Sequence, residues 1–357
     1  MPIPNLSGVK GVRQTHPPVA MLFAVISAMM LMRSFSKITR DAYATRFSHE
    51  GIRNMIRACT DEKSGVFSIF FTLGTLARGD GGFPEGGSLP FARRIVAEFT
   101  ALGGKMLYNT HADKVLVENG SATGVMAGDE ILSADAVIVT VDTMAIDYLF
   151  DAPPKADWLD EMRAVTVPTM TTFVALGIDA DLKKYPRAGV SKLVKPITLA
   201  AQTYEYLYIN NYAHDLTYSP EGKTAMTIQL GGDTYDFWKT AKEEMRYDEE
   251  KQRLASAVTE ALAFVMPETH GRVDVCDIAT PLTYERYCGN WRGSWMTEMT
   301  SSMKMNNYPA VIKGLSGVYF AGQRMMPPGG LPVALMSGRT AVQYLCRDTK
   351  TVFVAEE

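Results

Sequence analysis

The residues best placed to do chemistry form a loop rich in glycine and proline near the C-terminus. An apolar run over residues 318–321 ends at Gly322, and the loop continues through Gly329 and Gly330 to Pro332. A short apolar run bounded by glycine predicts a buried strand. Glycine has no side chain, so a ligand can approach the backbone closely at these positions. The loop therefore predicts a site that holds a ligand mainly through main-chain groups.

A helix is predicted directly after this loop, over residues 333–346. Pro332 suits the first helical turn, where a missing N–H is no loss. The start of a helix presents free N–H groups and the positive end of the helix dipole. These groups favour an electron-rich ligand edge facing the loop.

This order of strand, loop and helix resembles the C-terminal flavin-contacting segment of a family of FAD-dependent oxidoreductases. The family includes phytoene desaturases, amine oxidases and retinol saturase-like enzymes. Ser337, Gly338 and Arg339 match the small-residue signature along the family's helix. A generic packing unit of strand, loop and helix is the alternative. The resemblance implies FAD as the cofactor, with these contacts to its flavin and ribityl region: Gly322, Gln323, Gly329, Gly330, Leu331 and Pro332.

A second glycine loop precedes a predicted amphipathic helix earlier in the chain. Residues 83–88 read Phe-Pro-Glu-Gly-Gly-Ser, and the helix that follows is apolar on one face and stops at Gly103. We expect Ser88 to cap this helix. The loop is similar to the family's aromatic-Pro-x-Gly-Gly motif, which implies that Gly86 and Gly87 border the substrate cavity. Glycine loops before helices also occur without such a role.

The periodicity then changes to short extended runs. Asn119-Gly120 predicts a tight hairpin turn, and residues 134–140 predict a buried parallel strand. The succession resembles the second piece of the family's FAD-binding domain, in which Ala112 aligns with a position that contacts adenine through the backbone. The runs predicted before 134 are 105–108, 112–117, 122–126 and 130–132.

A substrate domain of mixed sheet and helices is predicted to follow, with strands at 170–179 and 272–278, further sheet over 193–211 and 224–230, and a helix at 248–265. Tyr204, Tyr206 and Tyr208 alternate, so they share one strand face, either as cavity lining or as ordinary sheet packing. Residues 283–295 resemble the family segment that faces the substrate cavity. The resemblance implies three cavity residues, although loop packing is the alternative: Tyr284, Trp291 and Trp295.

Together these elements predict an α/β chain with two domains, which a length of 357 residues allows. One is an incomplete Rossmann-like FAD/NAD(P)-binding domain, discontinuous in sequence, and the other is an α+β substrate domain. The predicted division is an irregular lead over 1–18, a helical part of the substrate domain over 19–78, the second FAD-binding segment over 79–150, the substrate domain over 151–305 and the C-terminal FAD-binding segment over 306–357.

The sequence contains no Gly-x-Gly-x-x-Gly, the motif whose backbone amides hold the FAD pyrophosphate in this family. A βαβ unit needs about 30 residues or more, and residues 1–18 cannot supply one. Two explanations stay open, a truncated or split gene product and a partner chain that carries the missing half. Gln323 also stands where the family often has Asp or Glu, although glutamine can still hydrogen-bond.

The apolar N-terminal segment, the cysteines, the histidines and the net charge indicate which kinds of partner the chain can have. Residues 19–32 are apolar but fewer than the roughly 20 that span a bilayer. A buried helix or one on a membrane surface is expected there, and a signal peptide is the alternative. Scattered cysteines and histidines offer no metal spacing, and reduced thiols indicate a cytoplasmic protein. A net charge of −3 without a basic run gives no support for nucleic-acid binding.

The function implied by the resemblance is that of an FAD-dependent oxidoreductase, of the desaturase, saturase or amine oxidase type. It would move hydride between the flavin and an apolar small molecule such as a polyene or another lipid. No catalytic residue can be assigned, and the sequence has no G-x-S-x-G elbow and no P-loop. The cofactor would carry the redox chemistry. A chain that is non-catalytic alone and needs a partner with the dinucleotide-binding motif is the alternative.

Overall fold

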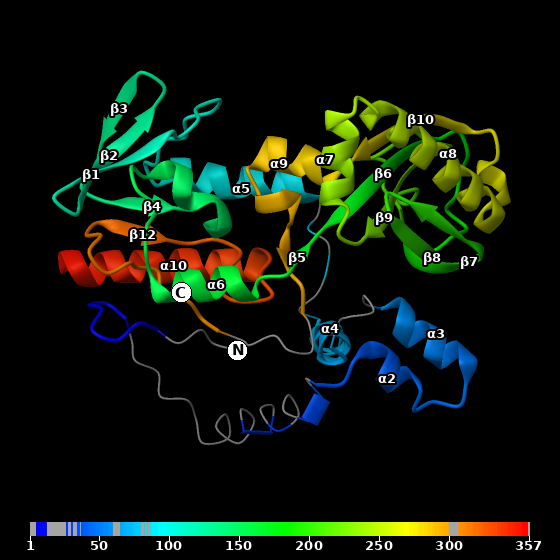
Figure 1. Ribbon diagram of the computed structural model, residues 1–357, viewed down its shortest axis with the longest axis horizontal. Helices are drawn as coiled ribbons and strands as arrows, with labels where there is room; N and C mark the ends of the chain where they lie inside the picture. Colours follow the sequence, from blue (N-terminus) through cyan, green and yellow to red (C-terminus); the bar gives the residue numbers. More distant parts are fainter. Residues whose placement is uncertain are drawn as a thin grey trace. The chain divides into compact units, whose positions relative to one another are not determined.

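The computed structural model of the protein describes residues 5–12, 26–27, 30, 34–35, 37–59, 65–79, 82, 84, 86–299 and 306–355. The chain divides into two compact units (Figure 1). Unit 1 combines Met1–Thr166 with Met296–Glu357, and unit 2 is Val167–Trp295. Unit 1 is therefore assembled from both ends of the sequence. The finer division into five segments stays a prediction.

Unit 1 is built on two parallel strands, β4 (Val137–Val139) and β12 (Val318–Phe320), with Tyr319 opposite Ile138. Every residue of β12 is buried, as expected for an apolar strand of a parallel sheet. Helix α10 (Leu331–Thr349) packs beside β12, and the Tyr319 hydroxyl donates to the Asp348 carboxylate at 3.2 Å. The predictions of a buried strand before Gly322 and a helix after the loop are confirmed.

An antiparallel meander stands beside these strands, made of β1 (Lys114–Glu118), β2 (Ser121–Ala127) and β3 (Glu130–Ser133). Asn119 and Gly120 have φ angles of 49° and 77°, so both adopt the left-handed conformation that a two-residue hairpin requires. The hairpin prediction is confirmed. The predicted strand over 105–108 is wrong, because no described strand pairs with this segment and its residues are exposed.

Four helices precede the meander in the described part of the chain: α2 (Arg40–Ala44), α3 (Glu50–Ala58), α4 (Phe67–Arg78) and α5 (Ser88–Ala101). Ala44, Ile56, Val66 and Ile69 form a small core there. Within the described residues, no helix is both long enough and apolar enough to cross a bilayer. The predicted apolar helix over 19–32 lies largely outside the described residues, and its contact with a membrane surface stays a prediction.

The caps of two of these helices are set by different means. The ring of His49 caps α3, because its Nδ1 accepts from the Gly51 N–H at 3.1 Å. Ser88 is the first residue of α5, and Gly87 occupies the cap position with a φ of 86° and no side-chain bond. A positive φ selects glycine there, so the cap prediction for Ser88 is wrong. The turn η1 (Thr143–Leu149) and helix α6 (Asp157–Val165) complete the segment before unit 2.

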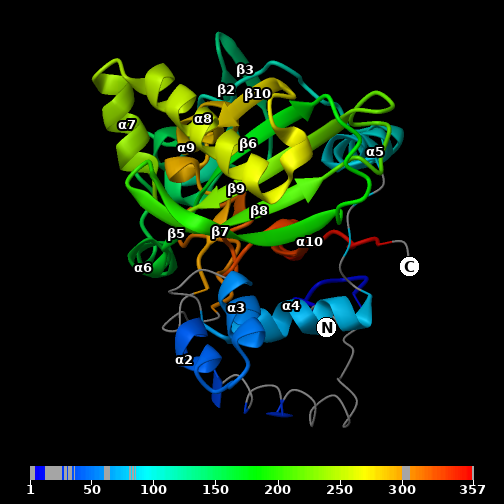
Figure 2. The same cartoon turned by 90° about the vertical axis from the view of Figure 1, so that its right-hand side faces the viewer.

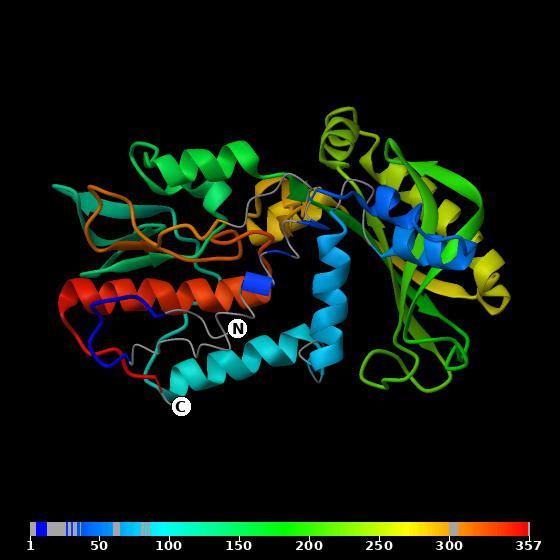
Figure 3. The same ribbon diagram turned by 90° about the horizontal axis from the view of Figure 1, so that it is seen from below.

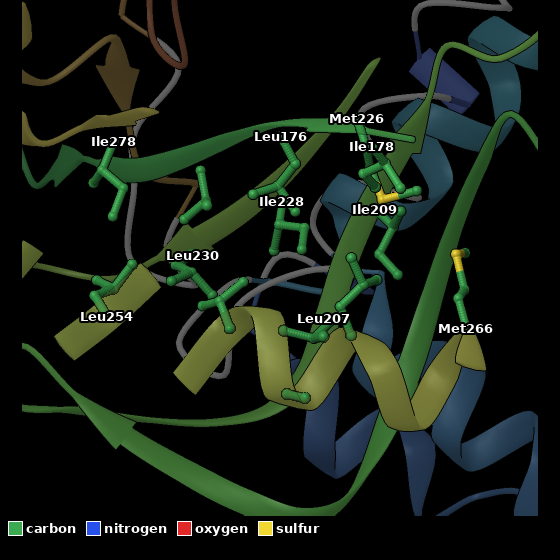
Figure 4. Close-up of a cluster of buried hydrophobic side chains, with 14 of the residues drawn as sticks. Leu176, Ile178, Leu207, Ile209, Met226, Ile228, Leu230, Leu254, Met266 and Ile278 are labelled. Carbon is green, nitrogen blue, oxygen red and sulfur yellow. The ribbon is translucent and has the colours of Figure 1, made fainter. Parts of the chain in front are cut away.

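Unit 2 contains an antiparallel five-stranded sheet in the order β10-β6-β9-β8-β7. Helix α8 (Tyr247–Val265) lies across one face of it (Figure 2). Between them lies an apolar core that includes Leu176, Ile228 and Leu254 (Figure 4). The remaining bounds in this part of the chain are β5 (Pro168–Thr169), β6 (Thr171–Ile178), β7 (Ala188–Leu199), β8 (Gln202–Asn211), β9 (Thr224–Gly231), α7 (Tyr235–Glu243), η2 (Pro267–Thr269), β10 (Val273–Ala279), α9 (Pro281–Cys288), η3 (Trp291–Gly293) and β11 (Met296–Thr297).

The three tyrosines of β8 do not share one environment. Leu207 and Ile209 belong to the core beneath α8, so Tyr206 and Tyr208 lie on the opposite face. Tyr204 packs against the core instead, and burial raises its pKa. Ordinary sheet packing therefore accounts for Tyr204, and the other two tyrosines border the face that α8 leaves open.

Candidate functional site

The end of β12 is fastened to helix α10 by a serine. Gly322 has a φ of 144°, and its N–H donates to the Ser337 hydroxyl oxygen at 2.9 Å. The same oxygen lies 3.1 Å from the Gly322 carbonyl and 2.9 Å from that of Ala334, either of which can accept its proton. Ser337 is 8% exposed. The backbone at Gly322 is thus held in one conformation by α10.

The far side of the loop requires two glycines for different reasons. Gly329 has a φ of 100°, and a Cβ atom there would collide with the Gln323 carbonyl oxygen. Gly330 has a φ of 85°, but its Cβ position faces open space apart from a Pro332 carbon at 3.9 Å. Gly329 therefore closes the loop on itself. Gly330 leaves a gap where a ligand can meet the backbone.

The start of α10 follows without a capping side chain. Gly330 occupies the N-cap position and makes no side-chain hydrogen bond to the helix. The first turn includes Pro332, and Leu331 is 53% exposed. An uncapped first turn presents backbone N–H groups and the positive end of the helix dipole. The loop and helix start together can hold an electron-rich group by main-chain donors.

A buried ion pair fixes the middle of the loop. The Arg324 guanidinium donates to both carboxylate oxygens of Asp142, at 2.6 Å from Nε and 3.0 Å from Nη2. The two side chains are 1% and 0% exposed. Arg324 Nη1 also lies 3.5 Å from the Thr297 hydroxyl. This bidentate pair ties the loop to the segment after β4. The sequence analysis did not predict this pair, although Asp142 lies two residues after a predicted buried strand.

Unit 1 holds the seven predicted cofactor contacts and two of the predicted substrate-cavity residues, Gly86 and Gly87. Six lie on the loop and helix start just described, namely Gly322, Gln323, Gly329, Gly330, Leu331 and Pro332. Ala112 is exposed and lies in the segment before β1. Gly86 and Gly87 precede α5 with φ angles of 75° and 86°. The ligand roles of all nine residues stay predictions.

Two of the cavity candidates of unit 2, Tyr284 and Trp295, contact residues on the sheet face opposite α8. Phe173 points to that face, since its neighbour Val174 is in the core. Its ring meets the Tyr284 ring edge-to-face, with centroids 5.9 Å apart. The Trp295 indole N–H donates to the Thr171 hydroxyl at 3.3 Å. Burial is the main cause that raises the pKa of Tyr284 to about 12, so this hydroxyl stays neutral at ordinary pH.

The segment that carries these aromatic residues is held by an arginine. Tyr284 lies on helix α9, and Trp291 begins the short turn η3. Arg292 has a φ of 53°, and its guanidinium binds the carboxylates of Asp233 and Asp236 at 3.3 and 2.9 Å. The ion pairs of this side chain help to offset the cost of a left-handed backbone conformation. The network anchors η3 within unit 2.

The sequence of this chain matches a known protein family over most of its length. The model of the flavin containing amine oxidoreductase family matches residues 25–346. The chain belongs to this family. FAD is therefore the cofactor that the site has to fit. This membership confirms the fold class and the resemblance inferred from the strand, loop and helix.

Individual relatives of this flavoprotein are distant. The hydroxyneurosporene desaturase of Rubrivivax gelatinosus is 26% identical over 290 residues, which cover 73% of this chain and 51% of the relative. The chain thus spans about half the length of the curated relative it matches. A putrescine oxidase structure is similar in fold, with a TM-score of 0.57 at 15% identity, over 89% of this chain and 69% of the other. An oxidoreductase from Methanosarcina mazei has a TM-score of 0.50 at 19% identity, over 80% and 60%.

The loop of unit 1 fits one end of FAD. Open space at Gly330 and an uncapped helix start suit a flat, electron-rich ring system held by backbone donors. The pyrophosphate end is different, because none of the 357 residues form the Gly-x-Gly-x-x-Gly that holds it in dinucleotide-binding folds. The loop therefore suits the flavin end of the cofactor, and no residue of this sequence is assigned to the phosphate end.

Proposed function

We propose that this chain supplies the flavin-contacting and substrate-binding parts of an FAD-dependent oxidoreductase. The observation that carries the proposal is the glycine loop, bonded to Ser337 and Arg324, that leads into a helix with no capping side chain. When bound, FAD supplies hydride transfer at its N5 atom. The chain's own contribution is to hold the flavin edge with main-chain donors from Gly330 onward and to keep the loop in one conformation.

The substrate in this proposal is an apolar small molecule, a polyene or another lipid. Phe173, Tyr284 and Trp295 supply aromatic contact area on one side of unit 2. Aromatic side chains contribute large apolar contacts at low conformational cost. The name of the desaturase from Rubrivivax gelatinosus supports the same class of substrate.

The alternative is a chain that is non-catalytic alone and acquires FAD only with a partner. Two observations support it, the absent pyrophosphate motif and the half-length match to the curated relative. This alternative keeps the same flavin-contacting loop. It changes only whether the isolated chain holds the cofactor.

The visible absorption spectrum tests both forms of the proposal. Flavin bands at nearly one FAD per chain, in protein purified alone, support an enzyme that is complete by itself. A colourless chain that turns yellow with a co-purified partner supports the alternative. If FAD is held in neither preparation, the proposed function is wrong.

Two glycine variants check the assignment of the loop. Gly330→Val places a branched side chain at a φ of 85° in the gap at the helix start, so we expect loss of flavin from whichever preparation carries it. Gly222→Val is the matched control, because Gly222 also has a positive φ, 77°, and nothing within 4 Å of its Cβ position, but lies in unit 2. Flavin content at the unmodified level in Gly330→Val would overturn the assignment.

The substrate class is tested separately. Bleaching of the bound flavin by an acyclic polyene but not by a diamine would support the apolar substrate.

A further inference from the structure

A single glutamine interrupts an aromatic row on the open sheet face of unit 2. Figure 3 shows the strands of this sheet in green and the helices of the same unit in yellow-green to yellow. Gln229 lies on β9, the middle strand of the five. Its neighbours Ile228 and Leu230 belong to the core beneath α8 (Figure 4), so the Gln229 side chain points to the opposite face. It is half-buried there.

The two side chains beside Gln229 in the sheet are aromatic. Phe173 on β6 and Tyr208 on β8 are its direct cross-strand partners, and side chains at such positions lie next to each other on one face. The Phe173 ring meets the Tyr284 ring with centroids 5.9 Å apart. Val190 of β7 lies opposite Tyr208 and extends the row. One carboxamide therefore lies within an otherwise mainly apolar row.

The carboxamide of Gln229 makes no hydrogen bond to any residue that the structure describes. A glutamine side chain offers two donor protons and an acceptor oxygen. Other polar side chains of this face are already bonded. Asn210 Nδ2 donates to the Thr227 hydroxyl at 3.4 Å, and the Trp295 indole N–H donates to the Thr171 hydroxyl at 3.3 Å. Gln229 thus keeps its hydrogen-bonding capacity for a ligand on the middle strand of the sheet.

This free carboxamide limits which apolar molecules the face can bind well. A hydrocarbon lying on the aromatic row would shield the amide from solvent without replacing its hydrogen bonds, and an unpaired buried amide opposes binding. A molecule with a hydroxyl or carbonyl group over Gln229 would pair with the amide and keep aromatic contact on both sides. An ionised group is less suited, because neither cross-strand neighbour of Gln229 offers a counter-charge.

We infer that Gln229 is a specificity-determining residue, which selects apolar lipids that carry one neutral hydroxyl or carbonyl group over plain hydrocarbons. The inference rests on the proposed function and narrows its substrate class. The polar group of the ligand exchanges a hydrogen bond with the Gln229 carboxamide. Its hydrocarbon chain lies along Phe173 and Tyr208.

The test measures the binding of three conjugated tetraene lipids that share one chain: parinaryl alcohol, the corresponding hydrocarbon and parinaric acid. Binding to the full chain is followed by energy transfer from tryptophan to the tetraene, and Trp295 lies beside the proposed site. We expect the alcohol to bind about tenfold or more tightly than either the hydrocarbon or the ionised acid, because only the alcohol pairs with the amide without bringing a charge.

Variants of Gln229 separate the amide from the shape of the face. Gln229→Met keeps the length of the side chain and removes its hydrogen-bonding groups, so the alcohol should bind about tenfold more weakly and the hydrocarbon no less tightly. A general loss of contact or of fold would weaken both probes alike. Gln229→Leu repeats the measurement with a branched side chain. Thr227→Val is the matched control on the same strand and face, because its hydroxyl is already bonded to Asn210.

Several results would overturn the inference: equal affinity for alcohol and hydrocarbon in the unmodified chain, an affinity ratio unchanged in both Gln229 variants, or a ratio lost in Thr227→Val. Tightest binding of the acid would also overturn it and would indicate a cation such as Lys192, opposite Tyr206 on β7.

Flavin content, read in the same preparations, tests the proposed function separately. A flavin-loaded chain with no preference for the alcohol rejects only the inference. A clear preference for the alcohol, with flavin in neither preparation, rejects the oxidoreductase function and keeps Gln229 as a binding residue. Binding of none of the three lipids rejects both the inference and the apolar substrate class.

Discussion

Neutralising Asp142 should loosen the flavin-contacting loop of unit 1. Asp142→Asn keeps the shape of the side chain and its ability to accept from the Met144 N–H, a bond of 3.1 Å in the structure. The change removes the charge opposite the Arg324 guanidinium, and both side chains are almost completely buried. The variant therefore isolates the electrostatic part of the pair.

The expected magnitude follows from burial. Removing one partner of a buried ion pair costs about 3–5 kcal/mol, because the remaining charge is left in a medium of low polarity. That free energy corresponds to roughly a hundredfold to a few thousandfold change in an opening equilibrium. The exposed pair between Arg292 and Asp236, with side chains 24% and 76% exposed, provides the contrast. Exposed pairs contribute about 0–1 kcal/mol.

Hydrogen exchange read by mass spectrometry resolves the effect by segment, which suits a chain with two compact units. In Asp142→Asn, peptides over 318–330 should lose protection by the factor given above, while peptides of β9 in unit 2 keep theirs. Asp236→Asn should change neither by more than about fivefold. The double variant Asp142→Leu with Arg324→Met should recover most of the lost protection, because an apolar pair needs no counter-charge.

A loss of less than about 1 kcal/mol in Asp142→Asn would refute this reasoning, since the pair would then behave like an exposed one. Equal loss in both units would also refute it, because the ion pair would then support the whole chain instead of one loop. A double variant no better than Asp142→Asn would show that shape, and not charge, is what the site requires.

Three further predictions concern the loop and pH. Gly329→Ala should destabilise unit 1 in urea unfolding by about 1–3 kcal/mol more than Gly330→Ala, because only at Gly329 does a Cβ meet backbone; equal losses would contradict this. Bonding to Lys184 is the main cause that lowers the pKa of Glu268 from 4.5 to about 2. The stability that this carboxylate contributes is thus present above pH 4.5 and lost as the pH falls through about 2. In Glu268→Gln, the free energy of unfolding should therefore fall less between pH 4.5 and pH 2. Burial is the main cause that raises the pKa of Tyr319 from 10.0 to about 12. The stability that this neutral hydroxyl contributes is present below pH 10 and lost as the pH rises through 12. Tyr319→Phe should therefore remove the alkaline loss of unfolding free energy in the same titration.

Local patterns in the sequence were sufficient for most individual elements. The apolar run of β12, the Asn119-Gly120 hairpin and the helix after Pro332 were each predicted from residues that are close together in the chain. Steric limits on φ and the apolar composition of a buried strand act within a few residues. The order of these pieces also sufficed for the flavoprotein family.

The failed prediction of a strand over 105–108 has a different origin. Its composition is that of a strand, yet a strand exists only when another backbone satisfies its N–H and C=O groups. The described residues provide no such neighbour. Local sequence records the propensity, and the presence of a partner strand decides the outcome.

Only the tertiary structure decided which distant residues come into contact. Asp142 and Arg324 are 182 positions apart, and Gly322 and Ser337 meet only because β12 and α10 pack together. No local rule links such pairs, since their energies come from burial after the chain has folded. The sequence by itself determined that a glycine loop precedes a helix. The fold determined that Ser337 and the buried Arg324–Asp142 pair hold this loop, and that α5, although patterned for a core, has no buried side chain among the described residues.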